Sequence, residues 1–92
     1  MVKNISILGS TGSIGPQTLE VVRYNKDIKV TALAAGSNVD LIEKQIREFK
    51  PEIACLWSEE KAKELKERVK DLDVKILSGM EGLIAVATEP KA

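Results

Sequence analysis

Three evenly spaced glycines, Gly9, Gly12 and Gly15, mark the part of the sequence best suited to chemistry. They follow a short apolar segment at residues 5–8 and precede a segment with helical periodicity. In a dinucleotide phosphate site one glycine turns the chain out of a strand, a second lets backbone N–H groups approach the pyrophosphate, and a third lets the helix pack against the sheet. Unpaired N–H groups at the helix start then face the negative charge. The spacing therefore predicts a dinucleotide phosphate turn at residues 9–15, called the glycine turn below.

Another ligand class and a purely structural role compete with this interpretation. The spacing differs from Gly-x-Gly-x-x-Gly, and no Gly-Lys-Ser/Thr follows, as it would in the phosphate loop of a nucleoside triphosphatase. We therefore favour a dinucleotide over a nucleoside triphosphate. The alternative is a tight strand-to-helix turn whose glycines solve only a packing problem.

The end of the second predicted strand indicates which dinucleotide is preferred. An NAD site usually has Asp or Glu about 20 residues beyond the glycine turn, where it holds the ribose hydroxyls. Here the strand leads into Gly36, Ser37 and Asn38, and the first carboxylate is Asp40. A carboxylate would repel a 2′-phosphate, whereas small donors accept one, so this 36–38 segment favours NADP(H) over NAD(H). Ser37 or Asn38 is equally suited to cap the helix that follows.

Strands and helices must alternate to position these two segments. Apolar runs predict strands at residues 5–8, 29–35, 53–57 and 74–77. Apolar residues at helical spacing predict helices at residues 14–25, from 38 to the proline at 51, from the capping serine at 58 to the apolar residue at 69, and at 80–88. This alternation is typical of an α/β protein with a doubly wound, Rossmann-like parallel sheet. We expect a truncated sheet of about four strands in the order 4-3-2-1, with helices on both faces.

Composition excludes several other classes of function. The chain has 92 residues, no net charge, no histidine and one cysteine, with one residue each of Trp, Tyr and Phe. We therefore expect no nucleic-acid partner, because a basic field and stacking platforms are both missing. A disulfide or four-thiolate zinc site needs more cysteine. The apolar runs are too short to cross a membrane, so we expect no membrane partner and a cytoplasmic location.

The remaining candidate side chains have simpler interpretations. The glutamates at 59, 60 and 64 lie among lysines on a charged helix, which predicts a solvated face rather than a metal site. We expect ion pairs at i,i+4 spacing between Glu59 and Lys63 and between Glu64 and Arg68. Cys55 lies in an apolar strand and is expected to be a small buried hydrophobe. For Trp57 we expect packing at the edge of the sheet, and the alternative is a surface anchor at the end of the strand.

Several blocks of the sequence resemble the start of the 1-deoxy-D-xylulose-5-phosphate reductoisomerase family. These blocks are ILGSTGSIG at residues 7–15, QTLEVVR at 17–23, AAGSNV at 34–39, ILSG at 76–79 and ATEP at 87–90. The resemblance covers the whole chain in register. It implies an NADPH-dependent enzyme of the non-mevalonate isoprenoid pathway that rearranges and reduces a ketose phosphate to 2-C-methyl-D-erythritol 4-phosphate, using a divalent metal (Mg or Mn).

The resemblance also assigns cofactor contacts within this chain. It implies that the pyrophosphate side of NADPH is lined by Thr11, Gly12, Ser13 and Ile14. It implies that the adenosine 2′-phosphate end is held by Gly36, Ser37 and Asn38. Some members of the family carry a basic residue where this chain has Ser37, which bears on the strength of NADP(H) selectivity.

The rest of the family's machinery has no counterpart here. Metal-binding carboxylates, substrate-phosphate residues and a flexible loop all lie C-terminal to the matching blocks. We therefore expect residues 1–92 to be the N-terminal part of an NADP(H)-binding domain, with neither catalytic nor metal-binding residues and no activity alone. The parent is expected to be a homodimer that binds a sugar phosphate, and the fragment to self-associate through its unpaired first strand. The alternative is a stand-alone dinucleotide-binding or interaction module.

Overall fold

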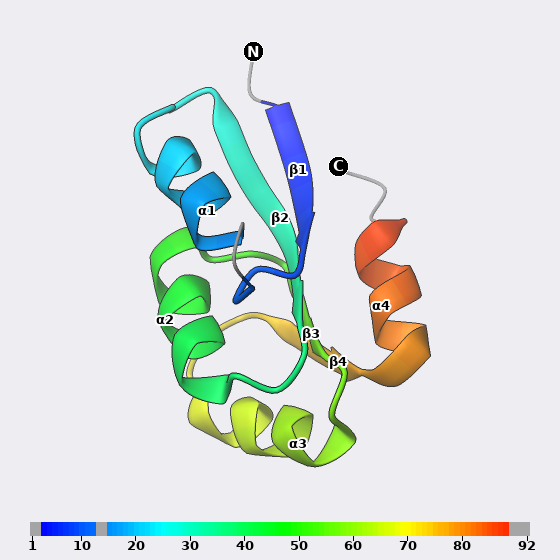
Figure 1. The fold of residues 1–92 in the computed structure, drawn as a ribbon. Coiled ribbons are helices and arrows are strands. Elements are labelled where there is room, and N and C mark those ends of the chain that lie inside the picture. Colours follow the sequence, from blue (N-terminus) through cyan, green and yellow to red (C-terminus); the bar gives the residue numbers. More distant parts are fainter. Residues whose placement is uncertain (1–2, 13–14, 89–92) are drawn as a thin grey trace.

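Strands and helices alternate strictly along the chain in the computed structural model, which describes residues 3–12 and 15–88. The elements are β1 (Lys3–Leu8), α1 (Gly15–Arg23), β2 (Ile28–Ala35), α2 (Val39–Phe49), β3 (Ile53–Leu56), α3 (Glu59–Arg68), β4 (Lys75–Ser78) and α4 (Gly79–Ala87) (Figure 1). All eight expected elements are present, with ends that differ by one to a few residues, as fraying ends usually do.

The four strands form one parallel sheet in the order β1-β2-β3-β4. This is the predicted order 4-3-2-1 read from the other edge, so that prediction is confirmed. The pairing of β1 with β2 shifts register between Ile5 and Ser6, which leaves Thr31 as an extra residue in β2. The Thr31 hydroxyl donates to the Ile5 carbonyl at 3.2 Å and holds the two strands together at this bulge.

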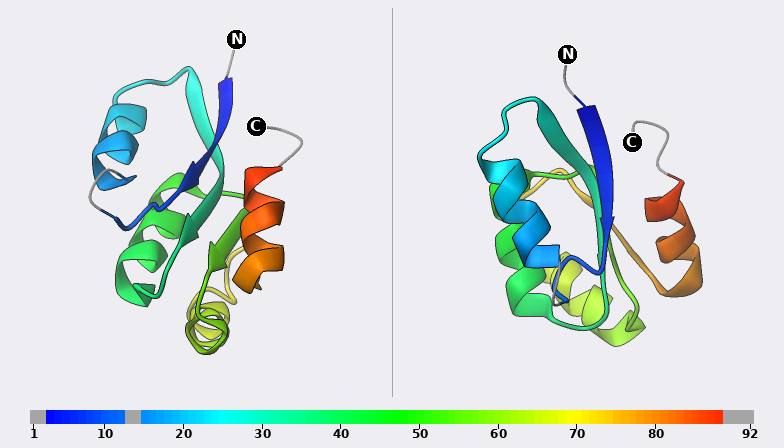
Figure 2. Two further views of the ribbon diagram at one scale, coloured as in Figure 1. Left: turned by 45° about the vertical axis from the view of Figure 1, so that its right-hand side comes forward. Right: turned by 45° about the horizontal axis from the view of Figure 1, so that its top comes forward.

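Helices cover both faces of the sheet, as predicted. Figures 1 and 2 show α1, α2 and α3 on one face and α4 alone on the other. The first three helices share a face because each makes a right-handed crossover in the same direction along the sheet. After β4 the chain turns back, and α4 crosses the opposite face toward β1.

Each face of the sheet has its own apolar core. The larger core joins the sheet to α1, α2 and α3, and its buried members include Leu19, Leu33, Ile42, Ile46, Leu56 and Leu65. The smaller core lies under α4 and consists of Ala32, Ala34, Cys55 and Val86. Small side chains on this second face let α4 lie close to the strands.

Polar side chains cap the start of two helices, as the sequence indicates. The Asn38 side chain accepts a hydrogen bond from the Leu41 N–H at 3.2 Å, and the Ser58 hydroxyl accepts one from the Lys61 N–H at 3.3 Å. Lys50 closes α2 in the left-handed conformation at φ 50°, directly before Pro51.

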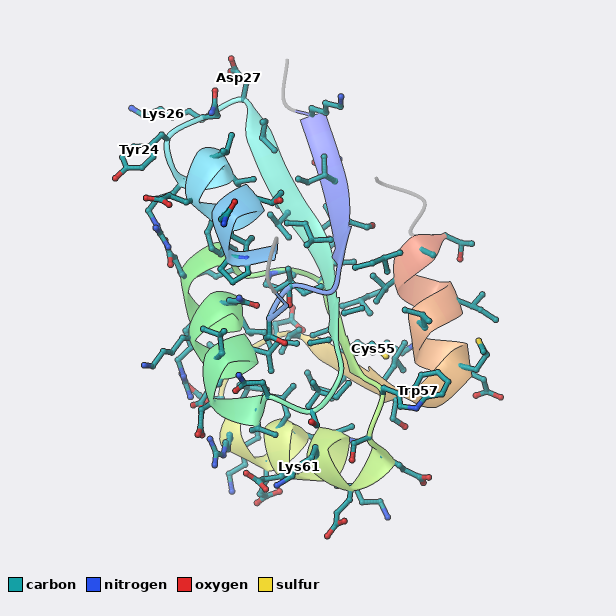
Figure 3. All side chains as sticks on the ribbon, viewed as in Figure 1. Tyr24, Lys26, Asp27, Cys55, Trp57 and Lys61 are labelled. Carbon is teal, nitrogen blue, oxygen red and sulfur yellow. The ribbon has the colours of Figure 1, made fainter. Side chains whose placement is uncertain are left out.

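Two expectations about single side chains have opposite outcomes. Cys55 is buried, as expected, and burial raises the pKa of its thiol. Trp57 is 55% exposed, so the expectation of packing at a sheet edge is wrong. Strand β3 lies between β2 and β4 and is therefore no edge strand. Trp57 comes directly after its last residue and lies at the surface (Figure 3).

Candidate functional site

The glycine turn and the 36–38 segment lie next to each other because they follow neighbouring parallel strands. Leu8 at the end of β1 pairs with Ala34 near the end of β2. The Ala34 carbonyl then accepts hydrogen bonds from the N–H groups of Gly9 at 2.7 Å and Ser10 at 2.8 Å. These two bonds join the start of the glycine turn to β2. Ligands of open α/β sheets bind beyond the carboxyl ends of the strands, which is where both segments lie.

Two glycines of the turn have the structural roles that the sequence predicts. Gly9 has φ 76°, a left-handed conformation that turns the chain out of β1. Gly15 begins α1, where an added Cβ would lie 2.3 Å from the Gly9 carbonyl oxygen and 2.6 Å from Ser10 backbone atoms. Only glycine lets the helix start so close to the strand.

Among residues 9–12 of the turn, one backbone N–H is left for a ligand. The Gly12 N–H donates to the Gly9 carbonyl at 3.0 Å, so this donor closes the turn. Within residues 3–12 and 15–88, the Thr11 N–H has no hydrogen-bond partner, and Thr11 is half-buried. Ser13 and Ile14 lie outside the described residues, so the predictions for them stay predictions.

The 36–38 segment is open on its outer side. An added Cβ on Gly36 would meet nothing within 4 Å, and Ser37 and Asn38 are exposed. The Asn38 side-chain oxygen is the cap of α2, which confirms the capping alternative for this residue. Its side-chain amide group can still donate, so capping and anion binding are compatible.

The first carboxylate after this segment is held by a partner on another helix. Asp40, in the first turn of α2, accepts a hydrogen bond from the Arg68 guanidinium of α3 at 2.5 Å. That bond holds the pKa of the Asp40 carboxyl below its ordinary value. Ion pairing with Arg68 offsets the negative charge of Asp40 beside the 36–38 segment.

Sequence reasoning missed one residue that touches the glycine turn. Gln45 of α2 is only 6% exposed, and its side-chain amide donates to the Ser10 carbonyl at 2.7 Å. The sequence feature that could have indicated it is a polar residue on the apolar stripe of a predicted helix, between Ile42 and Ile46. That feature is ambiguous without the fold, because the partner of Gln45 is 35 residues away.

The described residues contain neither a metal-binding cluster nor a membrane-spanning helix. Among them, no group of three or more His, Cys, Asp or Glu side chains could hold a metal ion. In the same part of the chain, none of the helices has the length and apolar character needed to span a bilayer. A hollow of about 470 Å³ is lined by Arg23, Lys26 and Phe49 among others, near the start of β2 and thus at the far end from the glycine turn.

Fold and turn together define a doubly wound α/β protein with a glycine-rich turn of the dinucleotide-binding type. Residues 5–92 match the family model described as 1-deoxy-D-xylulose 5-phosphate reductoisomerase, so the chain belongs to this family.

Curated relatives with this name are similar over nearly the whole chain. The protein of Lachnoclostridium phytofermentans is 65% identical over 91 residues, which are 99% of this chain and 24% of the relative. The protein of Lachnospira eligens is 60% identical over 87 residues, which are 95% of this chain and 23% of the relative. The chain thus spans about a quarter of the length of these relatives.

Solved structures of such enzymes have the same fold in this region. A crystal structure of a 1-deoxy-D-xylulose 5-phosphate reductoisomerase with NADPH, fosmidomycin and magnesium matches with a TM-score of 0.89 at 38% identity, covering 96% of this chain and 22% of that one. The Zymomonas mobilis enzyme in complex with NADPH matches with a TM-score of 0.91 at 27% identity, covering 97% of this chain and 24% of that one.

Proposed function

We propose that this chain provides the NADPH-binding portion of a 1-deoxy-D-xylulose 5-phosphate reductoisomerase. The observation that carries the proposal is the placement of the glycine turn beside the 36–38 segment, joined through the Ala34 carbonyl. NADPH complexes of solved family members support the choice of ligand. The whole enzyme then rearranges and reduces a ketose phosphate to 2-C-methyl-D-erythritol 4-phosphate in isoprenoid biosynthesis.

The two segments hold different parts of the cofactor in this proposal. Thr11 and Gly12, with Ser13 and Ile14, line the pyrophosphate, where the Thr11 N–H is the donor left over by the turn. The 2′-phosphate lies against the open side of Gly36, where Ser37 and Asn38 donate hydrogen bonds. When bound, NADPH supplies the hydride, and this chain's own residues bind and orient it.

The catalytic and metal-binding groups lie outside these 92 residues in our proposal. Cys55 is buried and its thiol pKa is raised, so it is no nucleophile. Among the described residues, no acidic cluster is suited to Mg²⁺ or Mn²⁺. A single reduced cysteine also suits the cytoplasm, where we place the protein.

An activity test compares the chain alone with a chimaera. The chimaera carries this chain in place of the matching N-terminal residues of the Lachnoclostridium phytofermentans relative, to which it is 65% identical. We expect NADPH-dependent reduction of the ketose phosphate by the chimaera and none by the chain alone. A chimaera that folds, retains metal binding and fails to use NADPH would contradict the proposal.

Cofactor preference is tested at Ser37, whose side chain is exposed beside the open face of Gly36. In the chimaera, Ser37→Lys should raise the affinity for NADPH about tenfold, or about 1.4 kcal/mol, and leave NADH unchanged, because the added charge meets only the 2′-phosphate. The gain should shrink with added salt. Equal gains for both cofactors would place the 2′-phosphate elsewhere.

Calorimetry with NADPH on the isolated chain distinguishes a partial domain from the alternative, a stand-alone module. A partial domain should bind NADPH weakly, because much of the cofactor's surface is left uncovered. Tight, sub-micromolar binding by a monomeric chain would instead favour a stand-alone dinucleotide-binding module. Absence of binding in both the chain and the chimaera would favour an interaction module.

A further inference from the structure

Gln45 is a buried polar residue with a long-range contact to the glycine turn. Its side chain reaches from α2 to the Ser10 carbonyl, 35 residues away in sequence, with a distance of 2.7 Å between Nε2 and the oxygen. Ser10 is fully buried and Gln45 is 6% exposed, so the bond is shielded from water. A buried hydrogen bond of this kind fixes the orientation of the peptide group that accepts it.

The direction of one peptide group decides where the Thr11 N–H points. The Ser10 carbonyl and the Thr11 N–H belong to the same peptide unit, which is planar and trans, so they point in opposite directions. Gln45 holds the carbonyl toward α2. The Thr11 N–H therefore points away from α2, toward the outer side of the turn.

The neighbouring N–H groups of the turn are already engaged. Those of Gly9 and Ser10 donate to Ala34, and that of Gly12 donates to Gly9. Of the four N–H groups at positions 9 to 12, only that of Thr11 lacks a partner within the described part of the chain. The donor whose direction Gln45 sets is therefore the one of these four that remains for a ligand.

Among the described residues, two buried polar atoms beside this bond have no hydrogen-bond partner, which a contact that served only stability would avoid. Within residues 3–12 and 15–88, the Gln45 side-chain oxygen and the Ser10 hydroxyl are buried without a hydrogen-bond partner. An unpaired buried polar atom is unfavourable, and an apolar side chain between Ile42 and Ile46 would avoid it on the Gln45 side. Local rules are broken in this way mainly where a site needs the residue.

We infer that Gln45 is a positioning residue for cofactor binding, which holds the Ser10 carbonyl so that the Thr11 N–H faces the diphosphate of the dinucleotide. This inference rests on the proposed function. Gln45 itself touches no cofactor in this scheme, because it lies on the inner side of the turn. Its effect passes through a single peptide unit.

Nuclear magnetic resonance on the isotope-labelled 92-residue chain tests the inference, with NADP⁺ as the added ligand. In the free protein we expect a scalar coupling between the Gln45 side-chain nitrogen and the Ser10 carbonyl carbon, and slow solvent exchange of the Gln45 amide protons. On addition of NADP⁺, the Thr11 amide should show a large downfield shift. No coupling, or no response of Thr11 while other amides of the turn respond, would overturn the inference.

Gln45→Met removes the donor and nearly keeps the volume. We expect it to move the Thr11 amide signal in the free protein and to weaken NADP⁺ binding about tenfold, or about 1.4 kcal/mol. Ile46→Val, at a neighbouring buried position of α2, is the control for lost stability and should keep wild-type affinity. Gln17→Met, at an exposed position of α1, controls for the chemical change itself.

The possible failures are distinguishable. Wild-type affinity in Gln45→Met would overturn the inference and leave the proposed function intact. If the wild-type chain binds no NADP⁺ even at millimolar concentration, Gln45→Met is compared with the wild type in the chimaera. Absence of binding there too overturns the cofactor role together with the proposed function, and the free-protein coupling still decides whether Gln45 orients the turn. If Gln45→Met does not fold, the wild-type coupling and the response of the Thr11 amide to NADP⁺ still decide the inference.

Discussion

Gly15 shows how closely a single residue can be constrained by the backbone around it. A methyl group at this position would lie 2.3 Å from the Gly9 carbonyl oxygen and 2.6 Å from backbone atoms of Ser10. The atoms in conflict are backbone, so a rotation of a side chain cannot relieve the clash. Gly36 is the opposite case, since a methyl group there would meet nothing within 4 Å.

We expect Gly15→Ala to lower the free energy of unfolding by about 1–3 kcal/mol or more, because overpacking usually costs this much. The clash outweighs the gain in helix propensity, which is about 1 kcal/mol. Chemical denaturation followed by circular dichroism measures the change. Gly36→Ala is the control and should unfold like the wild type, and a Gly15→Ala variant of unchanged stability would contradict the described start of α1.

At the scale of elements, α4 depends on a close approach to β3 and β4. A Cβ on Gly82 would lie 2.5 Å from the Cys55 sulfur and 2.9 Å from the Leu77 Cβ. The buried residues of the sheet face beneath α4 are the small Ala32, Ala34 and Cys55. Helix and strands therefore fit each other through small residues on both sides.

We expect Gly82→Ala to destabilise the protein by roughly 1–3 kcal/mol. Cys55→Ala should restore part of that loss in the double variant, because it removes the nearest obstructing atom. Thermal or urea unfolding of both single variants and the double variant gives the coupling energy, which we expect to lie within about 0.5–3 kcal/mol. Strictly additive effects would show that the two residues do not touch.

Ion pairs link the outer surface of α2 to α3 and to the residues that follow it. Arg68 of α3 binds Asp40 and Glu43 of α2, and Arg47 of α2 binds Asp71, which follows α3. The expected pair of Arg68 with Glu64 is present, whereas none joins Glu59 to Lys63 within the described residues. Hydrogen bonds from Arg68 and Arg47 lower the pKa values of Asp40 and Asp71, respectively. A carboxyl whose pKa is lower in the folded than in the unfolded state stabilises the fold above its unfolded pKa of about 3.9, and this contribution is lost as the pH falls through the folded value.

We therefore expect the melting temperature to fall below about pH 4 more steeply in the wild type than in Asp40→Asn. High salt should reduce the difference, because the pairs are exposed. A series of melting curves against pH, at low and high salt, measures both effects. Asp27→Asn is the matched control, since its carboxyl has no ion pair within the described residues, and identical profiles for all three proteins would contradict this role.

For the whole molecule, the exposed edge of β1 is the main liability. Within residues 3–12 and 15–88, β1 pairs only with β2, and it ends at Leu8, which is 55% exposed. The chain carries no net charge, so there is little repulsion between copies. An unpaired edge strand under these conditions is a template for pairing with another copy.

We expect the isolated chain to self-associate through β1, in a manner that depends on concentration. Leu8→Lys should shift sedimentation-velocity profiles toward the monomer, because a charge on an edge strand opposes pairing. Val21→Lys is the matched control, since Val21 is 57% exposed but lies on α1. A monodisperse wild-type monomer at high concentration would contradict the prediction.

The sequence by itself determined the element order, the sheet order and the positions of the two candidate binding segments. These depend on local physics: apolar periodicity separates strands from helices, and glycine and proline mark their ends. The right-handedness of parallel crossovers then leaves few arrangements of the strands. The adjacency of the glycine turn and the 36–38 segment follows from that arrangement alone.

Only the tertiary structure decided which side chains meet across the fold. The contact from Gln45 to Ser10 and the pairing of Asp40 with Arg68 span 35 and 28 residues, and no local pattern specifies such partners. The exposure of Trp57 likewise depends on where β3 lies in the sheet. Periodicity reports which face of an element is apolar, whereas the partner of a polar side chain is set by how the crossovers bring separate elements together.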